Sequence, residues 1–467
     1  MSSDRGGPPA RGEGRFRPGR SRPAQAARLQ NPARVIASSF LAAILVGTVA
    51  LALPFARADP GRAPLVDALF TAVSAVCVTG LVTVDTGSYW STGGQVVILL
   101  LIQAGGLGLM TLATLFVIVV SRRLGLRARL VAQAQSRAVT AADVRQVVTG
   151  VVLFAVVGEI LLALVLAVRF ATAYAEPPGQ ATYSAVFHAI SAFNNAGFSL
   201  YADSLTRYAE DGWVLLPIAV AVILGGLGFP VLFELLRRGH RPREWSVTTR
   251  ITLIVTVVLL VGGTAVLLAT EARNPATLRP LPAGPTLLGG FFAAVMPRTA
   301  GFNALDVSAM RPESLLVTDV LMFIGGGSAG TAGGIKVTTF GLLAFVLWSE
   351  IRGDRAVEVG PRQVPITNQR EALAVVLLAV GLTAVATFSL LALTAEPLDR
   401  VLFEVVSALG TVGLSTGITA DLNTPAKLLL AVLMFLGRIG PLTLASALAL
   451  RDRTHRYRRP EERTTVG

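Results

Sequence analysis

Four short segments of this chain have residue types and a spacing that could bind an ion. Each is apolar, begins with phenylalanine and reaches a glycine ten residues later. They read FTAVSAVCVTGL, FHAISAFNNAGF, FFAAVMPRTAGF and FEVVSALGTVGL, and their glycines, Gly80, Gly197, Gly301 and Gly413, lie 117, 104 and 112 residues apart. Glycine lets backbone carbonyls turn inward without an intervening side chain. Four such segments around one axis would form a filter whose carbonyl oxygens replace the hydration shell of a cation.

The composition indicates an integral membrane protein. Of the 467 residues, 53% are hydrophobic and 15% are charged, and the mean hydropathy is +0.64. These values are far from those of soluble domains. A single cysteine and three histidines exclude a disulfide framework and a Cys/His metal site. The sequence offers no cluster of catalytic groups, so we expect no enzyme.

Basic residues are segregated along the chain. A net charge of +13 could suit nucleic acid, but 29 of the 41 basic residues fall in residues 1–34, 121–145, 234–250, 349–370 and 451–467. These stretches alternate with pairs of apolar runs, as cytoplasmic loops do. We therefore expect both termini in the cytoplasm, contact of the basic stretches with membrane lipid, and no nucleic-acid partner.

Each of the four segments lies between two long apolar runs, and is itself too short to cross a bilayer. We predict an all-α polytopic membrane protein with four tandem helix–pore-loop–helix repeats, eight spanning helices in total, around a central pore. The run from Trp213 to Phe233 is expected to be one spanning helix. The predicted units are a disordered basic tail (1–33), repeat 1 (34–124), a cytoplasmic loop with repeat 2 (125–239), repeat 3 with a glycine-rich loop (240–353), repeat 4 (354–450) and a basic tail (451–467).

The second long run of each repeat also has glycines near its midpoint. Gly105, Gly225, Gly325 and Gly437 lie 25, 28, 24 and 24 residues after the four segment glycines. Small residues let helices pack closely, and they can equally line a pore. For Gly105 and Gly225 both interpretations remain open.

The third repeat contains six glycines within the ten residues 325–334. Each glycine costs a helix about 1 kcal/mol relative to alanine, so this stretch cannot form a regular helix. We predict an unwound, flexible loop that ends near Lys336. The alternative is that these glycines only allow tight packing.

Isolated polar residues within the apolar runs allow two interpretations each. A lone charge such as Arg438 faces either a cavity or a partner, for which Glu159 is the candidate. His188 is interpreted as a packing residue with satisfied nitrogens rather than as a ligand. Asp85, Asp203, Asp306 and Asp421 follow the segment glycines within eight residues. They either attract cations at an outer mouth or are ordinary loop acids.

The four loops, together with GGGSAGTAGGIKVTT, resemble the Trk/Ktr/HKT superfamily of potassium transporters over roughly residues 34–450. With no earlier long spanning segment, the chain is most similar to the Ktr-type membrane subunit. The resemblance implies potassium uptake across the plasma (inner) membrane, with K⁺ bound by the filter carbonyls. The implied filter residues are Val78, Thr79, Gly80 and Leu81; Asn195, Ala196, Gly197 and Phe198; Thr299, Ala300, Gly301 and Phe302; and Thr411, Val412, Gly413 and Leu414.

The resemblance also implies a gate inside the membrane and partners outside this chain. The gate residues would be Gly325, Gly326, Gly327, Ser328, Gly330, Thr331, Gly333, Gly334, Lys336 and Arg438. The implied partners are a second copy in a homodimer and a cytosolic ring of nucleotide-binding regulatory subunits. We expect no cofactor in this chain, and ATP or ADP only on the regulatory subunit. The alternative function is a proton- or sodium-coupled cation carrier, although the four repeats all run the same way.

Overall fold

The computed structural model describes residues 32–124, 141–354 and 356–449. Nearly all of this part is helical, and the strands within it are β1 (Glu358–Val359) and β2 (Arg362–Gln363), which pair antiparallel. The predicted all-α class is confirmed for these residues. The basic tails lie outside the described residues, except that Pro32 and Ala33 begin the first helix.

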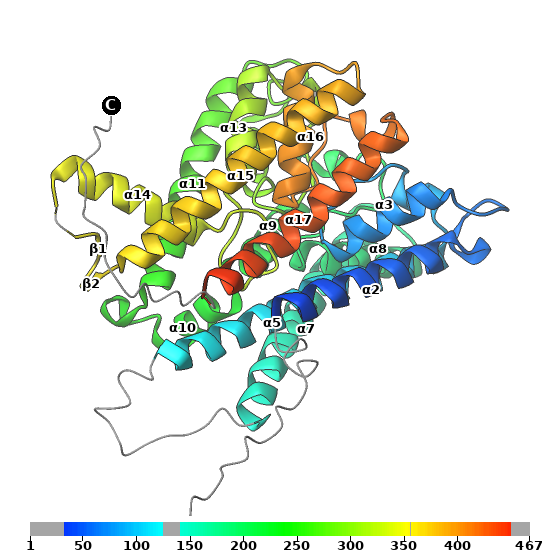
Figure 1. Ribbon diagram of the computed structural model, residues 1–467. Coiled ribbons are helices and arrows are strands. Elements are labelled where there is room, and N and C mark those ends of the chain that lie inside the picture. Colours follow the sequence, from blue (N-terminus) through cyan, green and yellow to red (C-terminus); the bar gives the residue numbers. More distant parts are fainter. Residues whose placement is uncertain (1–31, 125–140, 355, 450–467) are drawn as a thin grey trace, which may run out of the picture.

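The helices form four groups, each with a long helix, a short helix and a third helix, which is long in the first and last groups (Figure 1). The groups are α2 (Pro32–Ala52), α3 (Leu65–Val76) and α5 (Thr92–Leu124); α7 (Ala141–Ala173), α8 (Pro178–Phe193) and α9 (Gly212–Leu227); α11 (Val247–Glu271), α12 (Ala283–Val295) and α13 (Pro312–Phe323); and α15 (Ile366–Leu393), α16 (Leu398–Gly410) and α17 (Thr424–Ala449). Further helices are α4 (Thr86–Tyr89), α10 (Phe229–Arg238) and α14 (Val337–Arg352), with single turns η1 (Pro54–Ala56), η2 (Thr206–Tyr208), η3 (Pro242–Glu244), η4 (Val307–Ala309) and η5 (Ile418–Ala420).

All four short helices start in the same way. The residue that caps each N-terminus is a proline: Pro64, Pro177, Pro282 and Pro397. Proline is compatible with a helix start because its fixed φ is close to the helical value and because N–H groups at a helix start have no partner within the helix. The helices have 12 to 16 residues. At about 1.5 Å per residue they are shorter than the roughly 30 Å hydrocarbon core of a bilayer.

Several long helices are suited to crossing a membrane. In the described part, Val148–Ala173, Val247–Glu271 and Ile366–Leu393 are long and apolar enough, and the bent pair α9 and α10 would make a fourth span. Shorter apolar helices include Ile36–Ala52 and Thr92–Gly108. The chain is therefore a multi-pass membrane protein, and the count of eight spans stays a prediction.

One long run does not form the expected single helix. Between Trp213 and Phe233 the chain bends by 99° where α9 ends and α10 begins. Gly228 has a φ of 91° at this break, and Pro230 stands in the first turn of α10. Proline lacks the N–H that would continue the helix, and glycine tolerates the left-handed backbone. The break therefore follows from the sequence Gly-Phe-Pro.

The four groups close into a ring. Neighbouring groups touch through α5 with α7, α9 with α12, and α13 with α16, and α17 of the last group packs against α2 and α3 of the first. Figure 1 shows this closure, with α17 (red) lying near α2 and α3 (blue). Each short helix packs against the first helix of its own group.

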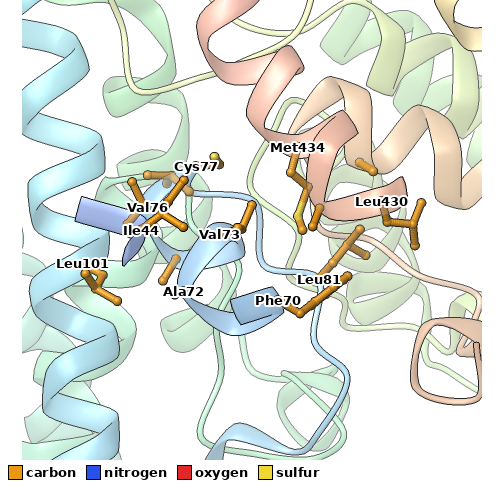
Figure 2. Packing of buried hydrophobic residues seen from close by; sticks show 14 of the residues in the cluster. Ile44, Phe70, Ala72, Val73, Val76, Cys77, Leu81, Leu101, Leu430 and Met434 are labelled. Atoms are coloured by element: carbon orange, nitrogen blue, oxygen red, sulfur yellow. The ribbon is translucent and has the colours of Figure 1, made fainter. Parts of the chain in front are cut away.

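Apolar side chains pack closely around each short helix. Figure 2 shows Ala72 of α3 on the side of Leu101 of α5, and Phe70 on the opposite side, toward Leu430 and Met434 of α17. Outward residues such as Val46, with 69% of its surface exposed, remain apolar. In a bilayer, tight packing rather than escape from water holds helices together. Tight packing around the short helices also restrains the loops that follow them.

Candidate functional site

The four segment glycines share one backbone conformation. Each has a positive φ: 94° at Gly80, 70° at Gly197, 71° at Gly301 and 96° at Gly413. Two residues earlier, the chain is again left-handed at Val78, Asn195, Thr299 and Thr411, with φ from 50° to 71°. Left-handed turns at every second residue set the peptide groups in an orientation that an ordinary β-strand does not have.

The left-handed residues before the glycines are costly. For L-residues this conformation is unfavourable by roughly 1–2 kcal/mol, and β-branched residues seldom adopt it. Yet Val78, Thr299 and Thr411 are all β-branched. Strain repeated at equivalent places indicates a functional requirement for that backbone shape.

The glycines form a closed ring with carbonyl oxygens of the neighbouring segments. A Cβ atom at Gly80 would lie 2.5 Å from the carbonyl oxygen of Ala196, and one at Gly197 would lie 2.8 Å from that of Ala300. The same relation links Gly301 to Val412 at 2.4 Å and Gly413 to Thr79 at 2.0 Å. Each segment therefore contacts the next, and the fourth returns to the first. No side chain fits at any of the four positions.

Serine side chains support two of the four segments. Ser74 accepts a hydrogen bond at its Oγ from the N–H of Gly80 (3.0 Å), and Ser407 does the same for Gly413 (3.1 Å). Sequence analysis missed these residues, although serine stands six residues before the glycine in three of the four segments. In the third segment that position is Val295.

An open cavity of about 690 Å³ lies on one side of the ring. All four segment glycines line it, and so do Asp85, Asp203 and Asp306. Asp421 is not among its lining residues and ends η5 instead. A shared acidic lining favours cations, so three of the four predicted acids have the placement expected of an outer mouth.

The three acids that line this cavity, which we call the acidic vestibule, also have local roles. Asp85 caps α4 and Asp306 caps η4, each by accepting a backbone N–H. Asp203 accepts from Arg207 at 2.6 Å. Burial alone would raise the pKa of Asp203, but hydrogen bonds from Arg207 and Thr206 hold that pKa below its usual range. Asp203 thus stays ionised, with its charge largely balanced by Arg207.

Glycines of the long helices pack against the ends of the short helices. A Cβ at Gly105 would lie 2.0 Å from the carbonyl oxygen of Val76, and one at Gly225 would lie 2.1 Å from that of Phe193. Gly437 stands in the same relation to the carbonyl of Leu409, at 1.9 Å. The packing interpretation therefore holds for Gly105 and Gly225. The glycines thus allow close packing at the C-terminal, partly negative ends of three of the four short helices, α3, α8 and α16.

The glycine-rich stretch connects α13 and α14 as a loop rather than a helix, as predicted. It is held in place against the bend between α9 and α10. Gly327 donates its N–H to the carbonyl of Gly226 (2.7 Å), and Thr331 donates to that of Gly225 (3.2 Å). The loop closes on itself where Gly325 donates to Ile335 (2.8 Å). It therefore has a defined path, whereas the sequence predicted only flexibility.

Two segments of the ring touch this loop directly. The Thr331 hydroxyl donates to Oδ1 of Asn195 at 3.1 Å. A Cβ at Gly333 would meet Oγ1 of Thr411. Asn195 and Thr411 are the left-handed residues of the second and fourth segments. The loop therefore contacts the ring at residues that are not among those lining the cavity.

Two cations hold carbonyls of the same loop. Lys336 donates to the carbonyls of Ala332 and Gly333, and Arg438 donates to that of Thr331 and, at 3.3 Å, to that of Gly105. Arg438 is almost fully buried, with 2% of its surface exposed. The predicted gate residues are thus brought together in one place.

The suggested pairing of Arg438 with Glu159 is wrong. Glu159 instead accepts hydrogen bonds from Gln103 of α5 and from Asn194, which ends α8. Backbone carbonyls accept from both terminal nitrogens of Arg438: that of Thr331 in the loop and that of Gly105 in α5. His188 is confirmed as a packing residue: its Nδ1 contacts the Ser184 carbonyl (2.7 Å) and its Nε2 contacts Ser199 (3.0 Å).

Sequence analysis missed a second buried acid near the ring. Glu404 of α16 has no exposed surface. It accepts from the hydroxyls of Ser415 (2.5 Å) and Thr419 (2.7 Å), just after the fourth segment. The described part has no group of three or more His, Cys, Asp or Glu side chains that could hold a metal ion.

A ring of carbonyls inside membrane-spanning helices, open to an acidic vestibule, defines a membrane transport protein. The chain belongs to the TrkH family of cation transport proteins, whose model matches residues 19–455. This membership confirms the resemblance drawn from the four loops and the glycine-rich stretch.

Relatives cover almost the whole chain. It is 39% identical to the Ktr system potassium uptake protein B of Bacillus subtilis (strain 168), over 93% of this chain and 97% of that protein. It is 37% identical to the protein of the same description from Vibrio alginolyticus, over 93% and 94%. The potassium/sodium uptake protein NtpJ of Enterococcus hirae is 35% identical over 94% and 97%.

The fold also matches a solved structure. The potassium transporter TrkH from Vibrio parahaemolyticus superimposes with a TM-score of 0.66, covering 88% of this chain and 84% of that one. The identity is 21%, so the match supports the fold.

Proposed function

We propose that this chain takes up potassium across the plasma membrane through a filter built from the four glycine segments. The observation that supports this most is the closed ring of glycines against the carbonyls of Thr79, Ala196, Ala300 and Val412. Carbonyl rings replace the hydration shell of K⁺, and they need a backbone without side chains at the point of convergence. The names of the relatives point to the same ion.

The ion would move passively in this proposal. It enters through the acidic vestibule, loses water at the carbonyl ring and leaves toward the cytoplasm. The partly negative C-terminal ends of α3, α8, α12 and α16 lie close to the ring and favour a cation there. The four segments differ in sequence, so the carbonyl sites are expected to be unequal around the axis.

The glycine-rich loop is proposed as the gate. Its contacts with Asn195 and Thr411 support a position across the inner exit of the filter. Lys336 and Arg438 add positive charge at the same place, and repulsion of a cation by a fixed charge is strong in low-dielectric surroundings. The alternative, tight packing alone, predicts that loosening the loop lowers transport instead of raising it.

Control of the gate is assigned to partners. Two relatives are described as protein B of a Ktr system, which supports a membrane subunit within a larger assembly. We propose that a cytosolic ring of nucleotide-binding subunits binds the cytoplasmic loops, and that ATP or ADP acts only there. We also propose that two copies of this chain form a homodimer and that the N- and C-termini of each copy lie in the cytoplasm. A partner that binds one loop conformation better would shift the population of open channels.

A sodium-coupled carrier is the second candidate. The description of NtpJ names both potassium and sodium. Coupling would require that K⁺ uptake stop when Na⁺ is withdrawn at constant voltage.

The experiment is ion uptake into potassium-depleted cells that lack other potassium uptake systems. Uptake of K⁺ or Rb⁺ at a fixed imposed voltage is expected to persist with a protonophore and without Na⁺, while excess Na⁺ competes poorly. Loss of uptake on withdrawing Na⁺ would favour the carrier. Equal competition by Na⁺ would refute the filter assignment.

A further inference from the structure

The second filter segment lacks the support that the first and fourth receive. Ser191 occupies the position of Ser74 and Ser407, yet its hydroxyl has no hydrogen-bond partner among the described residues. The N–H of Gly197 is therefore not held as those of Gly80 and Gly413 are. A segment with a left-handed asparagine and no such bond needs another restraint.

A buried polar cluster lies directly behind this segment. Nε2 of Gln103 donates to both carboxylate oxygens of Glu159, at 3.1 and 2.9 Å. Nδ2 of Asn194 donates to Oε1 of Glu159 at 2.9 Å and to Oε1 of Gln103 at 2.8 Å. The three residues come from α7, from α5 of the neighbouring group, and from the end of α8. Glu159 has 7% of its surface exposed and Asn194 none.

Asn194 is the residue at which the short helix becomes the filter segment. It caps the C-terminus of α8, and the next residue, Asn195, has the left-handed φ of 58°. The side chain of Asn194 reaches outward to Glu159, whereas that of Asn195 reaches inward to Thr331 of the loop. The start of the segment is therefore held from both sides.

α7 also fits this junction tightly. A Cβ at Gly158 would lie 2.5 Å from the ring of Phe193, and one at Gly106 of α5 would lie 2.0 Å from Oδ1 of Asn194. Gly158 and Glu159 thus contact the consecutive residues Phe193 and Asn194. A lone acid at this depth is costly in a membrane, and such acids are rarely retained without a function.

We propose that Glu159 is a positioning residue for ion selectivity, which fixes the second filter segment through the side chain of Asn194. This inference rests on the proposed filter. The carboxylate suits the task because it only accepts hydrogen bonds, and both amide groups that face it donate. A glutamine would offer one acceptor oxygen and would turn a donor toward other donors. Loss of the carboxylate therefore removes one of three acceptors of the Asn194 amide, the others being Oε1 of Gln103 and the Ile190 carbonyl, and weakens the restraint on this side chain.

The test measures the ratio of K⁺ to Na⁺ affinity in uptake competition for wild type, Glu159→Gln, Glu159→Ala, Asn194→Ala and the double variant Glu159→Ala/Asn194→Ala. Glu159→Ala is expected to lower the ratio about tenfold, and Glu159→Gln about threefold because one acceptor remains. The double variant should match Asn194→Ala within about twofold, since both changes act through one hydrogen-bond network. The matched control is Asp211→Asn, a buried acid of the same helix group that lies at the outer end of α9.

The outcomes are separable. A wild-type protein that does not distinguish K⁺ from Na⁺ refutes the proposed function itself. A selective wild type, with Glu159→Gln and Glu159→Ala folded and equally selective, refutes only the positioning role. Effects of Glu159→Ala and Asn194→Ala that multiply in the double variant also refute it. If Glu159→Ala does not fold, the isosteric Glu159→Gln variant decides alone. If Asp211→Asn lowers the K⁺/Na⁺ ratio as much as Glu159→Gln does, the effect is general to buried acids and the positioning role is refuted.

Discussion

The side chain of Asn195 accepts a hydrogen bond from the hydroxyl of Thr331 at 3.1 Å, across 136 positions of sequence. One residue lies in the second filter segment and the other in the glycine-rich loop. The loop and the proposed filter are thus in direct contact. A movement of the loop must break or remake this bond, so gate and filter are expected to influence each other.

Replacing Thr331 by alanine should loosen the closed loop. One hydrogen bond of this kind contributes about 0.5–1.5 kcal/mol, which corresponds to roughly 2- to 10-fold more K⁺ flux without any regulatory partner. Uptake assays on the chain alone measure this. Thr264→Ala is the control, because that hydroxyl bonds only to Leu260 of its own helix. Reduced flux in a folded Thr331→Ala protein would instead support the packing interpretation.

The glycine ring can be tested with a pair of glycines of equal backbone conformation. Gly413 and Gly417 both have a φ of 96°, so alanine is equally strained at either. A Cβ at Gly413 would lie 2.0 Å from the Thr79 carbonyl, whereas one at Gly417 meets nothing within 4 Å. Gly413→Ala should lower the K⁺/Na⁺ ratio about tenfold or more, and Gly417→Ala should leave it within about twofold. Competition uptake with both variants measures the difference.

Gly80→Ser is expected to weaken K⁺/Na⁺ discrimination for the same reason as Gly413→Ala. Its Cβ would lie 2.5 Å from the Ala196 carbonyl oxygen. Equal behaviour of Gly413→Ala and Gly417→Ala would show that only backbone strain matters, and the convergence of carbonyls would then lose its support.

Acid pH should weaken the outer end of α9 through Asp211. Burial alone would raise the pKa of Asp211, but hydrogen bonds from Arg169, Tyr174 and the Trp213 N–H hold it below its usual range. An unfolded aspartate has a pKa near about 3.9, so this stabilisation is complete above that pH and is lost as the pH falls through the lower folded pKa.

Asp211→Asn should therefore lower the apparent Tm at pH 7, and the gap to wild type should narrow below about pH 4. Losing a buried, paired acid is expected to cost about 1–3 kcal/mol at neutral pH. Thermal unfolding of the purified protein across pH 3 to 7 measures the gap. A gap that stays constant over this range would show that the ionised form of Asp211 is not favoured by folding.

Both termini are predicted to be cytoplasmic. The basic residues of stretches 1–34 and 451–467 should remain on the inner side, as positively charged flanks of membrane helices do. Reporter fusions at residue 20 and at residue 460 are expected to give the same, inside signal. Opposite signals at the two ends would mean an odd number of spans and would end the eight-helix prediction.

The sequence predicted the parts of this fold that repeat. Four glycines at matching positions and two apolar runs around each were enough to locate the four short helices and the unwound loop. The four prolines at the starts of the short helices were an unused signal of the same kind. Repetition makes such features visible because chance does not produce the same spacing four times.

Features that occur once could not be predicted. Gln103 and Glu159 are 56 residues apart, and no periodicity connects them. Charge alone suggested Glu159 as a possible partner of Arg438, but the two belong to different helix groups, and the arginine donates to the backbone carbonyls of Thr331 and Gly105. The left-handed Val78, Thr299 and Thr411 contradict local preference, so propensity argues against them. Such positions are set by tertiary contacts.

The closed ring has a consequence for how this filter responds to mutation. In an assembly of four identical subunits, one codon change alters all four quadrants at once. Here Gly80, Gly197, Gly301 and Gly413 belong to one chain, so each quadrant can be altered separately. Replacing one, two, three or four of them gives a graded series that a tetramer of identical chains cannot provide. Natural substitutions can likewise change one of the four glycines at a time, so the ion selectivity of the proposed filter can change one segment at a time.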